Sequence, residues 1–428
     1  MRPTRRRLLS AAVVLAVAAG PVAACSGDGS ATYDPSSAGG TDDHYRVTDA
    51  DLDAFAEVMA ARGQALSDGD REAFLATVDP DAGRAFRARE TNLFDNLQSL
   101  PVVSVAYDVG RSGLSPDEID GDDPTGRVQV VEQVRLEDAL SRPVGNQVGT
   151  TFVQREGTWY VGAEGDLPSS SAQDRPWYGG LVSWSRSGPV LLLADADAPS
   201  SQDAETLAPQ VAEDLTGVAD LLGQEAPPVL VDATSNGEAS ELSNASGEFA
   251  GAITRPLYAA TADDLGREAG ILVKLNPDYI DQLVADRRTM RHELTHVVLR
   301  RYSGRVPTWM SEGIAEYVGT YPATVADDEP AWSTYVDLEA RRPVLVATGN
   351  WGRDPSGDYL LARAAAQYVV TRHGLDAYLD VMRTFARKAP LDTPDATSEV
   401  LQDVIGESGE EVGQGAYALL TDAGTAGS

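Results

Sequence analysis

Apolar residues in the first part of the chain follow a helical spacing and then a strand spacing. Leu52, Phe55, Val58 and Met59 recur every three or four positions, which predicts a helix with one buried face. Further helices are predicted at 71–78 and 81–97. Segments rich in Val, Tyr and Thr then predict strands at 102–109, 126–136, 147–155 and 158–161, with a hairpin turn at Glu156-Gly157. Helices followed by an antiparallel sheet predict an α+β domain over residues 45–165.

A second α+β domain is predicted over residues 189–390, after a linker at 166–188. Short apolar runs predict buried strands at 190–194, 229–231 and 271–275, and residues 235–251 are polar and irregular. Helical spacing over 206–222 ends at Gly223, a residue that often terminates helices. Asn276-Pro277-Asp278 has the residue types of a helix start. Another helix is predicted at 359–372, and a helical tail at 391–428.

Composition supports a folded protein and excludes one class of partner. Hydrophobic residues make up 42% of the chain, which suits globular domains. The 34 Lys and Arg residues are outnumbered by 66 Asp and Glu residues, so the formal net charge is −32. Such a surface repels phosphate backbones, and we expect no nucleic-acid partner.

The N-terminus has the features of an export signal. Four arginines precede an apolar stretch from Leu8 to Ala19, which is too short for a typical membrane span. Val22-Ala23-Ala24-Cys25 resembles the bacterial lipobox, in which the cysteine is lipidated after cleavage. This resemblance implies a signal peptide at 1–24, a lipid anchor at Cys25 that holds the chain to the outer face of the cell membrane, and a flexible tether at 25–44. A plain signal peptide or an uncleaved anchor is the alternative, and export by the Sec or the twin-arginine route stays open.

The segment His292-Glu293-Leu294-Thr295-His296 carries the strongest chemical signal. Residues four apart share one face of a helix, so both imidazoles can reach one metal ion. Glu293 can then face a metal-activated water and accept its proton. Because the chain has four histidines in 428 residues, a chance match to this pattern is rare. The nitrogen and oxygen ligands favour one Zn²⁺ per chain.

A third ligand is expected from the segment that follows. Glu312 and Glu316 are four residues apart on a predicted apolar helix that starts near Pro307-Thr308. Two buried acids on one helix face need partners, and a metal with its histidines would provide them. From spacing alone, either acid can be the ligand.

The sequence shows two family resemblances, one carried by these motifs and one by the pattern of residues 45–165. The pair H-E-L-T-H-V-V and W-M-S-E-G-I-A-E-Y resembles the gluzincin zinc peptidases, closest to the minimal peptidase MA-like domains. The resemblance implies Glu312 as third ligand, Glu316 as the support of a histidine, and a tyrosine at the position of Tyr359 as donor to the oxyanion. His373, the one other histidine of this predicted domain, is the second candidate for that donor. The 45–165 pattern resembles the cone-shaped fold of the nuclear transport factor 2-like superfamily.

The expected function is a zinc peptidase at the bacterial cell surface, acting on protein or peptide substrates. The glutamate of the aminopeptidase G-A-M-E-N motif has no counterpart in Gly251-Ala252-Ile253-Thr254, which favours an endopeptidase. The alternative is a cell-envelope lipoprotein that uses an inactive peptidase fold for binding or scaffolding.

Overall fold

The computed structural model describes most of the chain after the predicted tether. The described residues are 47–114, 123–165, 175–236, 251–259, 266–328, 333, 336, 345, 351, 355–388 and 393–426. The predicted signal peptide, the tether and Cys25 lie outside these residues.

The first region consists of three helices followed by a four-stranded antiparallel sheet. Its strands are hydrogen-bonded in chain order, each antiparallel to the next. Glu156 and Gly157, with φ of 49° and 84°, form the turn between the last two strands, as predicted. Its elements are α1 (Asp49–Asp68), α2 (Arg71–Leu75), α3 (Arg84–Ser99), β1 (Val102–Leu114), β2 (Thr125–Leu136), β3 (Val144–Arg155) and β4 (Thr158–Gly165).

Local sequence explains where the first helix begins and ends. Thr48 and Asp51 form a reciprocal capping box at the start of α1, and Gly69 ends the helix in the left-handed conformation. The buried face of α1 carries Phe55, whose ring stacks on Phe152 of β3 with centroids 4.2 Å apart. The helices therefore pack on one face of the sheet, and the predicted α+β class is confirmed.

The second region is a five-stranded mixed sheet with a layer of helices. The strand order is β5-β6-β7-β9-β8, in which β6, β7 and β9 are parallel and the two edge strands are antiparallel to their neighbours. The strands are β5 (Val182–Ser187), β6 (Val190–Asp195), β7 (Val229–Ala233), β8 (Ala252–Tyr258) and β9 (Glu268–Leu275). The helices are α4 (Ala204–Leu222), η3 (Pro277–Tyr279), α5 (Ile280–Asp286), α6 (Arg288–Val298), η4 (Arg300–Tyr302), α7 (Thr308–Thr320), α9 (Pro355–His373), α10 (Leu375–Lys388), α11 (Pro394–Ile405) and α12 (Gly409–Ala426).

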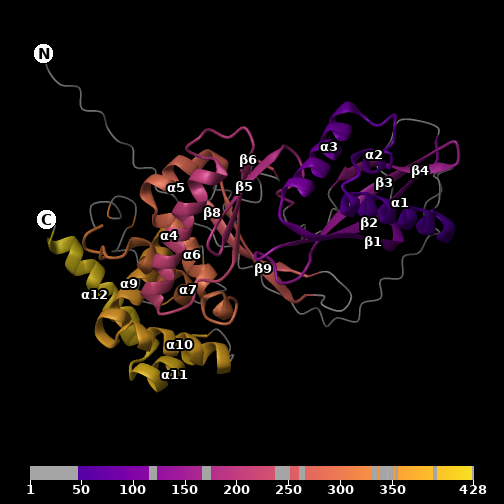
Figure 1. Ribbon diagram of the computed structural model, residues 1–428. Helices are drawn as coiled ribbons and strands as arrows, with labels where there is room; N and C mark the ends of the chain where they lie inside the picture. The colour runs from indigo at the N-terminus through magenta and orange to yellow at the C-terminus, as the bar shows by residue number, and fades with distance from the viewer. Residues whose placement is uncertain are drawn as a thin grey trace, which may run out of the picture.

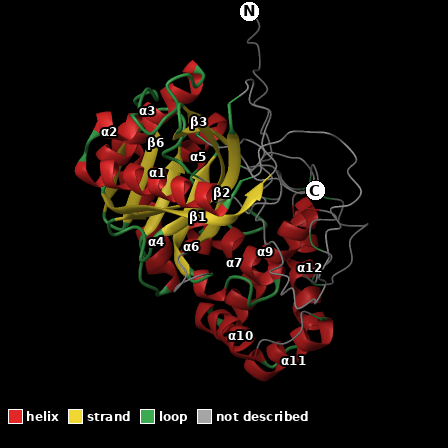
Figure 2. Ribbon diagram, turned by 90° about the vertical axis from the view of Figure 1, so that its right-hand side faces the viewer, coloured by secondary structure: helices red, strands yellow, loops and turns green. Residues whose placement is uncertain are grey.

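Both faces of the five-stranded sheet are buried. In β6, Leu192 points into a core shared with the helices, whereas Leu191 and Leu193 point into a core shared with the first region. This alternation follows from the two-residue period of a strand, and it explains why β6 reads as a continuous apolar run. Figure 1 shows the two regions side by side with this sheet at their junction, and Figure 2 shows α10 and α11 at the far end of the helical layer.

The predicted linker at 166–188 is partly a packed joint. Arg175 pairs with Glu132 and Glu164 at 2.8 and 2.9 Å, and Trp177 is buried in the shared core. Asn96 of α3 donates to the carbonyls of Trp177 and Gly180, both at 2.9 Å. Since β5 pairs with β6 along its length, the second region begins before residue 189. Within the described chain, no helix has both the length and the hydropathy to cross a bilayer.

Candidate metal centre

Two packed helices position the centre. Helix α6 carries His292, Glu293 and His296, and its apolar side, including Leu294 and Val297, is completely buried in the helical core. The neighbouring helix α7 carries Glu312 and Glu316 on the face that it turns towards α6. The sequence signals for both helices are therefore confirmed, and they bring the predicted ligands together.

Three candidate ligand atoms converge on one point. His292 Nε2 lies 3.1 Å from His296 Nε2 and 3.3 Å from Glu312 Oε2, and His296 Nε2 lies 3.5 Å from that same oxygen. The His292 and Glu312 side chains are buried, whereas the His296 side chain is 15% exposed. The centre is thus closed on the side of His292 and accessible on the side of His296.

This triangle has the dimensions of a metal site. Metal bonds of about 2.0–2.1 Å to nitrogen and oxygen, at tetrahedral angles, place ligand atoms about 3.3 Å apart. The three distances of 3.1, 3.3 and 3.5 Å lie around that value. Glu312 Oε2 is buried and faces both ring nitrogens at 3.3 and 3.5 Å, but neither contact has the geometry of a hydrogen bond. A cation between the three groups would compensate the charge of this buried carboxylate. The described residues of this group therefore fit a metal ion, with a fourth position left to solvent or substrate.

Glu316 supports the centre from behind His292. Its Oε1 lies 3.1 Å from His292 Nδ1, and its Oε2 accepts a hydrogen bond from Arg288 at 2.7 Å. Contact with Nδ1 leaves Nε2 free to bind a metal, since the two nitrogens divide the proton and the ligand between them. The structure thus separates the two acids: Glu312 faces both imidazoles, and Glu316 orients one of them.

The close approach of the helices depends on two glycines of α7. A Cβ atom on Gly319 would come within 2.9 Å of the Arg288 carbonyl oxygen and 3.4 Å of His292 Cβ. A Cβ atom on Gly313 would collide with the backbone of Ala362 in α9. The glycine that follows Glu312 therefore allows α9, with Tyr359 near its start, to pack directly against the ligand helix.

Glu293 follows the first candidate ligand on α6 and is buried. Its carboxylate is fully buried, and neither oxygen has a hydrogen-bond partner among the described residues. Burial raises the pKa of this carboxyl, and the neighbouring imidazoles of His292 and His296 oppose the shift. Thr254 of β8 donates to the backbone carbonyl of Glu293 at 3.1 Å and so joins α6 to the edge of the sheet.

Electrostatics couple the ligands in the metal-free protein. Burial disfavours charge on His292, but the facing carboxylates of Glu312 and Glu316 outweigh it and raise the pKa of His292 to about 10. Burial likewise disfavours ionised Glu312, but the two histidines lower its pKa to about 2. Without metal, His292 therefore carries the proton that a metal ion would displace.

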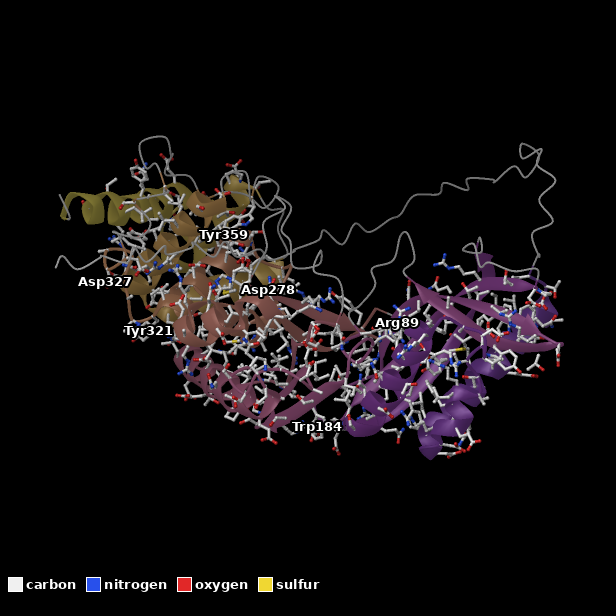
Figure 3. The ribbon with its side chains drawn as sticks, turned by 90° about the horizontal axis from the view of Figure 1, so that it is seen from above. Arg89, Trp184, Asp278, Tyr321, Asp327 and Tyr359 are labelled. Atoms are coloured by element: carbon white, nitrogen blue, oxygen red, sulfur yellow. The ribbon has the colours of Figure 1, made fainter. Side chains whose placement is uncertain are left out.

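The two candidate oxyanion donors lie in different surroundings. The Tyr359 ring centroid is 6.4 Å from that of His292 and 5.1 Å from that of Trp351. Figure 3 shows Tyr359 in the helical region, far from Arg89 of the first region. His373, at the end of α9, instead contacts Glu407 at 3.1 Å. The geometry favours Tyr359, and His373 has the contacts of a helix-terminal residue.

Two residues near the centre were not anticipated from the sequence. Arg288 lies four positions before His292, a spacing that could have placed it on the ligand face of α6. Thr254 lies in the segment that was compared with the aminopeptidase motif, but its contact with α6 was not predicted. Both reach the centre through contacts between separate elements.

Comparison with known proteins gives little additional information. The sequence matches no protein-family model and no curated protein. Two solved structures from Novosphingobium aromaticivorans are similar. One, assigned as an aromatic ring hydroxylase, has 18% identity and a TM-score of 0.22, covering 28% of this chain and 89% of that chain. The other, assigned as a scytalone dehydratase, has 14% identity and a TM-score of 0.21, covering 29% of this chain and 91% of that chain. At these TM-scores, neither similarity informs the fold or the chemistry of this chain.

Proposed function

We propose that this protein is a zinc-dependent peptidase. The observation that carries the proposal is the triangle of His292, His296 and Glu312 atoms, with the unpartnered carboxylate of Glu293 one residue from the first ligand. Structural zinc sites are usually rich in cysteine and fully coordinated, whereas catalytic sites have three protein ligands and an open position. The resemblance of the two motifs to gluzincins supports the same assignment.

Each residue has a defined task in the proposed reaction. When bound, zinc supplies a Lewis acid that polarises a carbonyl and lowers the pKa of water. Glu293 accepts the proton of the attacking water and returns it to the leaving amine. Burial raises the pKa of Glu293, which favours acceptance of a proton by this carboxylate. Tyr359 donates a hydrogen bond to the oxygen on which negative charge develops.

Supporting residues keep these groups in place. Arg288 holds Glu316, and Glu316 holds the ring of His292. Thr254 fixes the backbone at Glu293 against β8, an edge strand beside which an extended peptide can lie. The export signal and Cys25 place the enzyme, in this proposal, on the outer face of a bacterial membrane.

Metal analysis combined with a proteolysis assay tests the proposal. Purified wild-type chain should hold about one zinc ion, as expected for one catalytic site with three protein ligands. His292→Ala and Glu312→Ala should lose it. Glu293→Gln should keep zinc and lose casein cleavage, because a neutral amide cannot accept the proton. Glu399→Gln, an exposed acid on α11, is the matched control and should keep both properties.

The outcomes separate the alternatives. A wild-type chain without zinc refutes the metal site. Zinc bound with no hydrolysis of any protein or peptide favours a binding or scaffolding lipoprotein. If Glu293→Gln cleaves casein as fast as the wild type, the assigned proton acceptor is wrong.

A further inference from the structure

A pocket opens beside the metal centre on the side of His296. It has a volume of about 260 Å³ and is bounded by β8, the start of β9, η4 and the loop after it. His296 and Thr254 form part of its wall. The pocket therefore begins between His296, the most exposed of the three candidate ligands, and the edge strand β8. A substrate whose reacting carbonyl lay near the ligands could therefore extend into this pocket.

Four arginines line this pocket. They come from two separate parts of the chain, β8 and the turn that follows α6: Arg255, Arg300, Arg301 and Arg305. We call this set the arginine pocket. Among its described lining residues, Glu268 is the one carboxylate, 3.5 Å from Arg300. Arg301 donates to the neutral side chain of Gln224 at 2.6 Å and lies over the ring of Tyr302, and no described carboxylate forms an ion pair with it.

This concentration of positive charge contrasts with the rest of the protein. The chain has nearly two acidic residues for each basic one, with 66 against 34. Among the described lining residues, four arginines stand beside one carboxylate, and three of the arginines, Arg300, Arg301 and Arg305, come from η4 and the loop after it. Like charges held together repel one another unless an anion joins them, and a guanidinium presents two parallel donors that match the two oxygens of a carboxylate.

We propose that the arginine pocket binds a carboxylate of the peptide substrate next to the bond that is cleaved. This inference rests on the proposed peptidase function and names its substrate class. The carboxylate can belong to an Asp or Glu side chain or to the C-terminus of the peptide. Both sources offer the same planar anion, and the pocket is large enough for a single side chain or a chain end rather than a folded partner.

Peptide binding to a catalytically silent protein tests the pocket without relying on turnover. The probe is a dye-labelled octapeptide bound to zinc-loaded, full-length Glu293→Gln protein and followed by fluorescence anisotropy. In one series of peptides, each position in turn carries either a glutamate or, as its uncharged partner, a glutamine. Every peptide is made in two forms, one with a free and one with an amidated C-terminus. We expect at least one carboxylate-bearing peptide to bind about tenfold or more tightly than its uncharged partner, the range for hydrogen bonds to charged groups. The difference should decrease at high salt.

Arginine variants assign this preference to the pocket. The double variant Arg300→Gln, Arg305→Gln should abolish most of the preference for carboxylate-bearing peptides. Arg305 is exposed, so Arg305→Gln alone should reduce the preference without affecting folding. Arg383→Gln on α10 removes an exposed arginine elsewhere and should leave the preference unchanged. A preference in amidated peptides identifies a side-chain carboxylate, and one that needs the free C-terminus identifies the chain end.

Equal binding of charged and uncharged peptides overturns the inference. It is also overturned if Arg383→Gln loses as much of the preference for carboxylates as the pocket variants lose. Failure of the proposed function gives a different result. Selective binding without cleavage by the wild type retains the pocket and rejects the peptidase. Cleavage without any preference for carboxylates retains the peptidase and rejects the pocket.

Discussion

Replacing Gly313 by alanine tests whether the contact between α7 and α9 controls the metal centre. In an open helix this change stabilises the protein by about 1 kcal/mol, because alanine loses less backbone entropy than glycine. At Gly313 the added Cβ would lie 2.9 Å from the carbonyl carbon of Ala362 and closer still to its oxygen. These atoms belong to the backbone of α9 and cannot rotate away, so the helices must separate.

The structure gives both the sign and the approximate size of the effect. Overpacking of a tight core contact costs about 1–3 kcal/mol. Set against the gain of about 1 kcal/mol in helix propensity, the net result should be a loss of up to about 2 kcal/mol of unfolding free energy. Gly217, inside α4, is the matched control because its Cβ would meet nothing within 4 Å. Gly217→Ala should therefore stabilise the protein by up to about 1 kcal/mol.

Urea unfolding of the zinc-loaded proteins measures both changes, and zinc affinity and peptide cleavage are measured on the same samples. Gly313→Ala should also bind zinc more weakly, since Glu312 precedes Gly313 and moves with it. The reasoning is refuted if Gly313→Ala is as stable as Gly217→Ala. Normal zinc binding in a destabilised Gly313→Ala protein would show that helix spacing and ligand geometry are independent.

Two further predictions concern the ligands. Glu316→Gln should lower zinc affinity by about 10- to 100-fold, the usual effect of losing a carboxylate that orients a ligand histidine. Glu399→Gln should leave the affinity unchanged. Competition with a chelating dye measures both affinities, and equal values for the two variants contradict the role assigned to Glu316. Zinc binding at pH 7 should release about one proton, because the pKa of His292 is about 10 without metal and the ligand must be neutral. Zinc affinity should therefore rise with pH up to about 10. The metal-free protein should lose the stability of the His292–carboxylate contacts as pH rises through that value. Calorimetry in buffers with different ionisation enthalpies measures the released proton, and identical heats of binding in all buffers would show that His292 is already neutral.

Local patterns were sufficient to predict many of the elements. The apolar run at 190–194 is β6, Gly223 ends α4, and the Glu156-Gly157 turn joins β3 to β4. These features depend on residues adjacent in sequence, so the pattern predicts them directly. Strands β5 and β8 were not predicted. The first alternates serine with larger residues, and the second contains Arg255 and Pro256. Both lie at the edges of the sheet, where polar residues and proline are tolerated, and only pairing with a neighbour reveals them as strands.

The same distinction holds for the metal centre. His292 and His296 lie on one α-helix, and their four-residue spacing predicted that they meet. The choice between Glu312 and Glu316 could not be made from spacing, because each lies on the same face of α7. It depends on the position of α7 along α6, which Gly319 sets through its contact with the Arg288 backbone. Likewise, the position of Tyr359 beside His292 depends on the packing of α9.

The burial of the five-stranded sheet on both faces has a thermodynamic consequence. One face contributes to the core of the helices that carry the candidate ligands, and the other contributes to a core completed by the first region. The sheet therefore cannot lose either partner without exposing apolar surface to water. The two regions are therefore expected to melt as a single cooperative unit. A metal ion that binds the native helices shifts the unfolding equilibrium of everything that melts with them. Zinc should thus protect the first region from heat and proteases, although that region contributes no ligand.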